Sequence, residues 1–454
     1  MGALGDAPWR LLVLDFITFV ALGGGTVVIP LALVKHCQSN DDNCAAKAAQ
    51  RLVQYGLAGS LPQLLAAPLV GRACDRLGPK IPLLAGGVGV VASLILAALW
   101  ALYGWPFYAL LLSAAANGLC GGTLGFLAAS FAYAAASAKA PEEETYAPLA
   151  GAAEEEEAPE QRTGGFRGVA VALTLSICVS PAAGGAAAQH FGAFATLAGA
   201  SGIAAVALLW TLFALPAVAP TKSEAKADVL RGLKVVAAPP TRFLALAWTL
   251  VATNNIGVGN IATQYLARDR SSTGVGLYIS LLGAAAAVGT LVIEPLVRKI
   301  WTGDEFRLNL LLARAGCLVA AGISVGFALL PASNPGIYGI ACLASVTAAS
   351  MPASRALLVA SAPKEDGGAA LGALGALESA SGLVAPVWLG YLYAYGARHS
   401  RAADAFYGTV ATAALAFVVL VVRPPEPRHE YLRRISLPAV TAVSEDGGGE
   451  GTLV

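Results

Sequence analysis

Gly71-Arg72-Ala73-Cys74-Asp75-Arg76-Leu77-Gly78-Pro79-Lys80 decides the fold, because this charged stretch with glycine and proline lies between two long apolar runs. Residues 51–70 precede it and residues 81–102 follow it. Each run approaches the roughly 20 apolar residues that a helix needs to cross a bilayer. A short charged turn between two such runs is typical of the aqueous link in a membrane hairpin. The stretch therefore predicts a membrane protein.

The composition agrees with this prediction. Of 454 residues, 57% are hydrophobic and 13% are charged, too apolar for a soluble chain and too long for a single anchor. The sequence predicts an all-α membrane protein with twelve transmembrane helices in a lipid bilayer. The apolar runs that predict them are 9–34, 51–70, 81–102, 106–134, 167–190, 192–215, 243–266, 274–297, 308–330, 335–358, 368–395 and 404–422.

The positions of Lys and Arg predict the orientation in the membrane. If the N-terminus is inside, most of the 29 basic residues fall in cytoplasmic segments, which is the usual bias. We therefore expect both termini in the cytoplasm, in a plasma membrane or an endomembrane. The first apolar run is longer than the core of a signal peptide, so we interpret it as the first transmembrane helix.

The charged stretch resembles a motif of the major facilitator superfamily of transporters, G-x-x-x-D-R-x-G-R-[RK]. The matching residues are Gly71, Asp75, Arg76, Gly78 and Lys80, and proline replaces the family's usual basic residue at position 79. The resemblance implies two pseudo-symmetric bundles of six helices. It also implies that the stretch is a cytoplasmic latch, in which Asp75 lies near the N-terminal dipole of helix 11 and the basic residues pair with neighbouring helix ends.

The chain divides into two halves of similar organisation. We expect bundles over 1–215 and 243–423, joined by a cytoplasmic linker over 216–242 that contains proline and lysine. A second charged turn at 294–304 occupies the position in the second half that 71–80 occupies in the first. Corresponding turns in two halves are what an internal repeat predicts.

Two segments fall outside this repeat. Residues 139–165 contain eight Glu, all between positions 142 and 160, and predict a disordered cytoplasmic insertion. The polar tail 424–454 is also predicted to be disordered and cytoplasmic. Either segment can bind a cytoplasmic partner, while a solvated segment without a function is the simpler interpretation.

Two regions resemble the branch of the superfamily that includes proton-coupled folate transporters and tetracycline-efflux proteins. The first is the glycine-rich stretch 117–125 with the residues at 131–133, and the second is 353–395. A separate region, containing Pro181, Gly184 and Gly185, is similar to an antiporter motif in helix 5, with Ser180 in place of its preceding glycine. Such proline and glycine residues bend a helix and let its neighbours approach closely.

Two carboxylates within the spans are candidates for proton coupling. Asp15 lies in the first apolar run, and Glu378 lies roughly 15 Å into the eleventh at 1.5 Å per residue. Ionisable groups at such depth are costly and often functional. A hydrogen bond or ion pair between helices is the alternative for both residues.

Neutral polar residues within the spans are candidates for solute contact. Asn117 lies on helix 4, Asn254 and Asn255 on helix 7, and Gln63 on helix 2. The resemblance implies that helices 1, 4, 7 and 10 line the central cavity, which favours the three asparagines. Hydrogen bonds between helices are the alternative. Cys37 and Cys44 share the first outer loop. The sequence is compatible there with either a disulfide or two free thiols.

The sequence argues against other classes of function. It contains no C-x-x-C, no Walker-type glycine loop and no H-E-x-x-H or G-x-S-x-G motif, so we expect neither an enzyme nor a cofactor or metal. A net charge of +1 argues against a nucleic-acid partner. We predict a secondary active transporter of a small organic solute, such as an organic anion or drug-like molecule, coupled to protons. A facilitative uniporter and a non-transporting receptor or scaffold are the alternatives.

Overall fold

The computed structural model describes residues 9–36, 42–137, 158–218, 229–239, 241–362 and 367–425, and these ranges are helical without a β-strand. The first half contains α1 (Trp9–His36), α2 (Asp42–Leu77), α3 (Lys80–Tyr103), α4 (Phe107–Leu119), α5 (Gly122–Ser137) and α6 (Ala158–Phe213). A short helix, α7 (Val229–Ala237), follows. The second half contains α8 (Arg242–Ala267), α9 (Ser272–Val288), the π-helix η1 (Gly289–Ile293), α10 (Glu294–Ile300), α11 (Glu305–Leu329), α12 (Gly336–Cys342), α13 (Ala344–Ser361), α14 (Gly367–Arg398), the short η3 (Ala402–Asp404) and α15 (Ala405–Val422).

Twelve membrane spans can be assigned to these helices. In the described ranges, nine segments are both long and apolar enough to cross a bilayer. One of them, within α6, has a kink at Gly192, where φ is 82° and ψ is 170°, and thus forms two spans. α2 and α8 are also long enough to cross but are less apolar, because both carry polar residues. The count agrees with the twelve apolar runs of the sequence.

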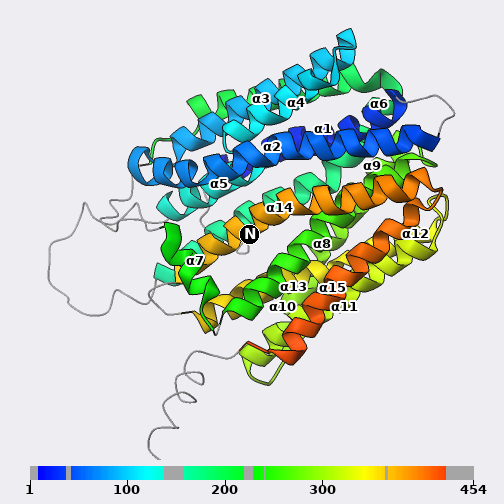
Figure 1. Cartoon of the computed structure of the whole chain (residues 1–454). Helices are drawn as coiled ribbons and strands as arrows, with labels where there is room; N and C mark the ends of the chain where they lie inside the picture. Colours follow the sequence, from blue (N-terminus) through cyan, green and yellow to red (C-terminus); the bar gives the residue numbers. More distant parts are fainter. Residues whose placement is uncertain are drawn as a thin grey trace, which may run out of the picture.

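The spans form two bundles. α1–α6 pack together in the first bundle, and α8–α15 pack together in the second (Figure 1). The bundles contact each other mainly where α6 meets α9 and where α2 meets α14. The first contact includes hydrogen bonds from the Ala182 N–H to Ser280 Oγ (2.9 Å) and from Thr273 Oγ1 to Gln189 Oε1 (2.7 Å). The second includes one from Ser60 Oγ to the Gly382 carbonyl (3.4 Å).

The two ends of the molecule differ in how closely the bundles approach. We call the end with Gly192 and Ser271 the Arg270 end, and the opposite end, with the turn between α2 and α3, the Lys80 end. The α6–α9 hydrogen bonds lie toward the Arg270 end. In Figure 1 the bundles converge toward α9 and α12 on the right and spread apart on the left. The structure therefore shows a conformation in which the bundles meet at the Arg270 end.

The link between α2 and α3 is shorter than the sequence indicates. α2 continues through most of the 71–80 stretch to Leu77, and α3 begins at Lys80. Gly78 adopts a φ of 81°, the left-handed conformation that commonly ends a helix. Arg76, in the last turn of α2, also suits the negative end of the helix dipole. The charged stretch is thus mostly the end of α2, and Gly78 and Pro79 alone form the link.

Two helices extend into segments that the sequence places outside the bundles. α6 begins at Ala158, inside the segment 139–165 that the sequence predicts to be disordered. Proline at position 159 and the surrounding glutamates favour a helix start there. In the linker, α7 packs with Val235 and Val236 buried, and Thr241 Oγ1 donates a hydrogen bond to the Val235 carbonyl (2.5 Å). Residues 138–157 and 426–454 lie outside the described ranges.

Candidate functional site

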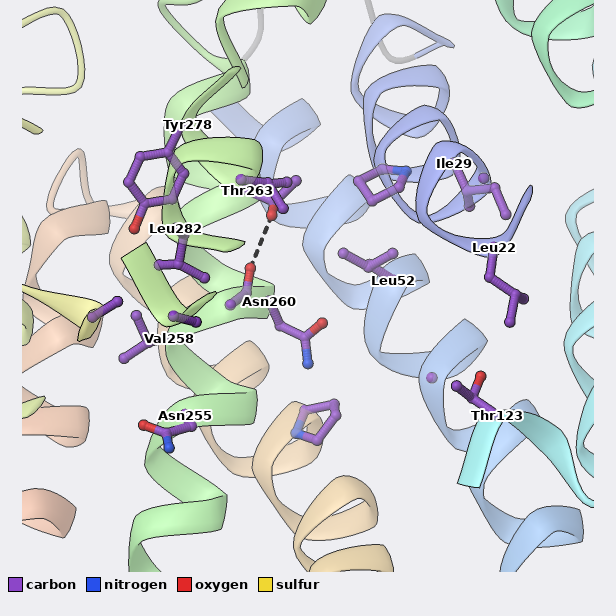
Figure 2. A pocket seen from close by; sticks show the side chains of 18 of the residues that line it. Leu22, Ile29, Leu52, Thr123, Asn255, Val258, Asn260, Thr263, Tyr278 and Leu282 are labelled. Carbon is purple, nitrogen blue, oxygen red and sulfur yellow. Dashed lines mark hydrogen bonds between the residues drawn. The ribbon is translucent and has the colours of Figure 1, made fainter. Parts of the chain in front are cut away.

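A central cavity of about 580 Å³ lies between the two bundles. Figure 2 shows its lining, with Leu22, Ile29 and Leu52 from the first bundle facing Val258 and Leu282 from the second. Most lining side chains are apolar or small. The volume is within the range that holds a drug-sized organic molecule.

The polar groups of the lining are amides and hydroxyls. The amides are Asn117, Asn254, Asn255 and Asn260, and the hydroxyls are Tyr55, Ser93, Thr123, Thr263, Tyr278 and Thr347. Within the described part of the chain, the lining has no Asp, Glu, Lys, Arg or His. The cavity therefore offers hydrogen bonds but no formal charge.

Three of the predicted solute-contact residues come together here. Asn117 reaches the cavity from α4, and Asn254 and Asn255 reach it from α8. Asn254 Nδ2 donates to Asn255 Oδ1 at 3.4 Å. Asn260 and Tyr278 also line the cavity, although the sequence did not single them out. Asn260 is a further amide in the apolar run of α8 and could have been found by the same criterion, whereas nothing marks Tyr278 among the other aromatic residues.

Gln63 does not line the cavity. Instead its side chain packs over a break between α4 and α5, where a Cβ placed on Gly122 would approach Gln63 Cδ to 2.7 Å. Gly121 and Gly122 both have positive φ values, 98° and 59°, which end α4 and start α5. The apolar run 106–134, expected to be one helix, is thus two helices, because glycine permits this conformation at little cost.

Glu378 lies in a cluster beside the cavity, toward the Lys80 end. Its Oε1 accepts hydrogen bonds from Arg355 Nη2 and from Trp248 Nε1, both at 2.9 Å. The Arg355 guanidinium also lies 5.7 Å from the centre of the Trp248 ring. Met351, one turn before Arg355, and Pro386, about two turns after Glu378, line the cavity. The cluster thus joins α8, α13 and α14 next to the solute site.

Asp15 lies in the first bundle and is fully buried. Ser130 Oγ on α5 donates a hydrogen bond to Asp15 Oδ1 at 2.7 Å. Asp15 Oδ2 has no hydrogen-bond partner among the described residues. Leu22, two turns further along α1, lines the cavity, but Asp15 does not. The two predicted coupling carboxylates are therefore in different bundles and different surroundings.

The glycines of the helix 5 motif allow close contacts in two directions. A Cβ placed on Gly184 would approach Gly24 Cα of α1 to 2.7 Å, so this contact lies within the first bundle. A Cβ on Gly185 would overlap the Ser272 carbonyl of α9, in the second bundle. Pro181 packs against Gly276 of α9. The motif therefore lies at the contact between the bundles.

The predicted latch is described only in part. Lys80 Nζ donates hydrogen bonds to the carbonyls of Leu212 (3.0 Å) and Leu215 (2.5 Å) at the end of α6. Nothing is described of the Asp75 side chain, so its role stays a prediction. The surroundings of Gly71 and the side chains of Cys37 and Cys44 are also not described, so the disulfide stays a prediction.

The second charged turn has a denser set of contacts. Arg298 bonds to Glu294 one turn earlier, to Glu305 Oε1 (2.8 Å) and to Asn309 Oδ1 (2.8 Å). Asp304 caps α11 by accepting hydrogen bonds from the backbone N–H groups of residues 306 and 307. These contacts fix α10 against the start of α11.

Residues 14–346 match the sequence model of the Major Facilitator Superfamily. The chain belongs to this superfamily. It is therefore an all-α, multi-pass membrane protein with the major facilitator fold, and membership supports general solute transport rather than catalysis of a reaction. Nothing in the match singles out the folate and tetracycline branch.

Solved transporters have a similar fold. The nucleoside transporter NupG is 14% identical, with a TM-score of 0.63 over 92% of this chain and 99% of its own. The human organic anion transporter MFSD10 (TETRAN) is 19% identical, with a TM-score of 0.60 over 91% of this chain and 100% of its own. A D-xylose-proton symporter is 13% identical, with a TM-score of 0.64 over 92% and 98%. No curated protein matches the sequence. These identities show the fold alone.

Proposed function

We propose that this protein is a secondary transporter that moves a small organic solute by alternating access. The observation that carries the proposal is the cavity of about 580 Å³ that both bundles line. A site shared by two bundles can open to either side when the bundles rock against each other. The contacts at the Arg270 end fit a conformation closed at that end, which is one of the two conformations that alternating access requires.

Uptake into reconstituted vesicles tests this proposal. Vesicles are offered a mixture of several hundred small organic compounds, and their contents are identified by mass spectrometry. The test variant is Gly259→Leu, because Gly259 lines the cavity and a Cβ there has nothing within 4 Å, so leucine would fill solute space. The control is Gly202→Leu, which also has open space but lies on the exposed surface of α6.

We expect the parent and Gly202→Leu to accumulate the same compounds. Gly259→Leu should lose at least nine-tenths of this uptake, which corresponds to a loss of about 1.4 kcal/mol in the free energy of solute binding. Equal uptake by both variants would remove the cavity as the solute site. Absence of uptake by the parent would favour the receptor or scaffold alternative.

We further propose that transport is coupled to protons through Asp15 or Glu378. Both are carboxyl groups within the spans, where ionisable residues are costly unless they serve a function. Asp15 is the better candidate by its contacts, because Glu378 is already paired with Arg355. An imposed pH gradient should drive accumulation by the parent, and Asp15→Asn should abolish this accumulation while solute exchange continues. Accumulation by Asp15→Asn at the parent level would exclude this role of Asp15, and the same comparison with Glu378→Gln tests the other carboxyl.

Facilitative uniport is the second candidate, and one observation favours it. Among the described residues, the cavity lining has no acidic or basic side chain that could exchange a proton beside the solute. A uniporter would equilibrate its solute without accumulating it, and the rate would not follow the pH gradient. The vesicle measurement with and without this gradient separates the two candidates.

We also propose that the Lys80 end faces the cytoplasm, with both termini on that side. The bias of Lys and Arg toward this end supports the orientation. The division into halves at 216–242, the cytoplasmic latch at Asp75 and a cytoplasmic partner of the acidic insertion or tail remain proposals of the same kind.

A further inference from the structure

The chemistry of the cavity lining limits the charge of the solute. Its ten polar side chains are four amides and six hydroxyls, with no carboxylate, ammonium, guanidinium or imidazole in the described lining. Transfer of a charged group from water into such surroundings is costly unless an opposite charge compensates it. An anionic or cationic solute would find no such partner on these walls.

Three ionisable side chains on helices that line the cavity make contacts elsewhere. Arg355 pairs with Glu378, and the Arg51 guanidinium lies 5.5 Å from the centre of the Phe107 ring. Asp15 is buried two turns from the cavity and bonds to Ser130. None of these groups lines the cavity, so they do not supply the missing charge.

Three residues of the lining each have a buried polar atom without a hydrogen-bond partner in the described part of the chain: Asn117 Oδ1, Asn254 Oδ1 and the Tyr278 hydroxyl. The amide of Asn254 is oriented by its bond to Asn255, which leaves Oδ1 free. An unsatisfied buried polar atom costs about 1–3 kcal/mol. Because amide oxygens accept hydrogen bonds and do not donate them, a ligand that removes this cost must carry N–H or O–H groups.

The unpartnered oxygens belong to opposite walls. Asn117 lies on α4 of the first bundle, while Asn254 and Tyr278 lie on α8 and α9 of the second. The rest of the lining is mostly apolar, as the leucines labelled in Figure 2 illustrate. A solute that satisfies both walls therefore needs donors at two separate places and an apolar body between them.

We propose that the cavity takes an electrically neutral, drug-sized organic solute that is partly apolar and donates hydrogen bonds to Asn117 and Asn254. This inference rests on the proposed transport function only for what happens after binding. It replaces the organic anion suggested by the resemblance with a neutral class of solute. It also gives the two asparagines a function in specificity, because each bundle holds one end of the solute.

Binding to the purified protein in detergent tests the inference separately from transport. The probe is a library with equal numbers of neutral, anionic and cationic compounds of matched size, and the readout is the shift in unfolding temperature. We expect the stabilising compounds to be neutral molecules with at least two donors. A set of stabilising compounds that is mainly anionic or cationic would overturn the inference.

Variants locate the bound compounds. Asn117→Leu and Asn254→Leu remove one acceptor each with little change in volume, and each should weaken the binding of neutral compounds about tenfold, the equivalent of 1.4 kcal/mol. Gly259→Leu should abolish binding, and Gly202→Leu should leave it unchanged. Undiminished binding in both asparagine variants would overturn the assignment of the donors.

The two proposals can fail separately. Neutral compounds that bind at the Gly259 site but are not taken up by vesicles would support the neutral site and contradict transport. Charged compounds whose uptake is blocked by Gly259→Leu would support transport and overturn the neutral class.

Discussion

The carboxylate of Glu378 joins three helices through an ion pair and a hydrogen bond. Its depth in the eleventh run marks it as functional or paired, but its partners come from α8 and α13, which are distant in sequence. The pair is partly accessible, with 46% of the Arg355 side chain and 20% of the Glu378 side chain exposed. Because exposure weakens ion pairs, the Trp248 hydrogen bond should contribute as much to stability as the charge does.

Different substitutions at Glu378 should therefore lower the free energy of unfolding by different amounts. Glu378→Gln keeps an acceptor for the Trp248 indole N–H and should lower the free energy of unfolding by less than about 1 kcal/mol. Glu378→Ala leaves the indole unpartnered and should cost about 1–3 kcal/mol. Thermal unfolding of the purified variants measures both. Equal losses in the two variants would mean that the ion pair, not the indole bond, dominates.

The asparagines are the opposite case, because their position at the cavity could be predicted from the sequence. Polar amides inside apolar runs are expensive unless they find partners or a solute, so Asn117, Asn254 and Asn255 stand out from the apolar residues around them. The same criterion selected Gln63, which instead covers the break between α4 and α5. Composition alone does not separate these two uses, because both require a polar side chain within a helix.

The break in helix 4 and the extent of α2 show that helix boundaries could not be predicted from the apolar runs. Apolar runs give the length of a span, but glycine is compatible with both helical and left-handed conformations. Gly121 and Gly122 break the helix, whereas Gly71 continues it. This difference depends on packing against neighbouring helices, which a run of apolar residues does not encode.

The contact between α6 and α9 should control which end of the molecule is closed. A Cβ on Gly276 would overlap the Pro181 carbonyl and lie 3.2 Å from Ala182 Cα. Gly276→Leu should therefore separate the bundles at the Arg270 end and lengthen the distance between spin labels at positions 190 and 333. Gly322→Leu is the control, because its Cβ meets open space on α11. An unchanged distance in Gly276→Leu would mean that this contact does not hold the end closed.

Gly184 provides a comparison within the same motif. Its close contact is with Gly24 of α1, inside the first bundle. Gly184→Leu should overpack this bundle and lower the free energy of unfolding by about 1–3 kcal/mol or more. It should not shift the balance between the two ends in the fraction that folds. A shift equal to that of Gly276→Leu would show that both glycines act on the bundle interface.

At the scale of the whole molecule, the fold was predictable because the membrane restricts the choices. Backbone groups in the bilayer must be satisfied within each helix, so twelve apolar runs indicate twelve helical spans. The 71–80 stretch then identified the fold from a few residues. Which bundle contacts are formed, and at which end, depends on the conformation and could not be predicted from the same pattern.

Labelling from outside intact cells tests the proposed orientation. Single cysteines at Leu77, exposed at the Lys80 end of α2, and at Ser436, in the tail, should not react with an impermeant reagent until the membrane is opened. A cysteine at Phe191, exposed at the Arg270 end, is the positive control and should react at once. Reaction of position 77 or 436 in intact cells would reverse the orientation.

Alternating access is the central claim, and distances measured at both ends of one molecule test it most directly. One pair of spin labels joins the bundles at the Arg270 end, at His190 and Ser333, and a second joins them at the Lys80 end, at Leu77 and Thr302; these positions are exposed. With the protein in lipid nanodiscs, a neutral compound that binds the cavity should change the two distance distributions in opposite directions. Distributions that change in the same direction, or that do not respond to a compound whose binding Gly259→Leu abolishes, would contradict the account.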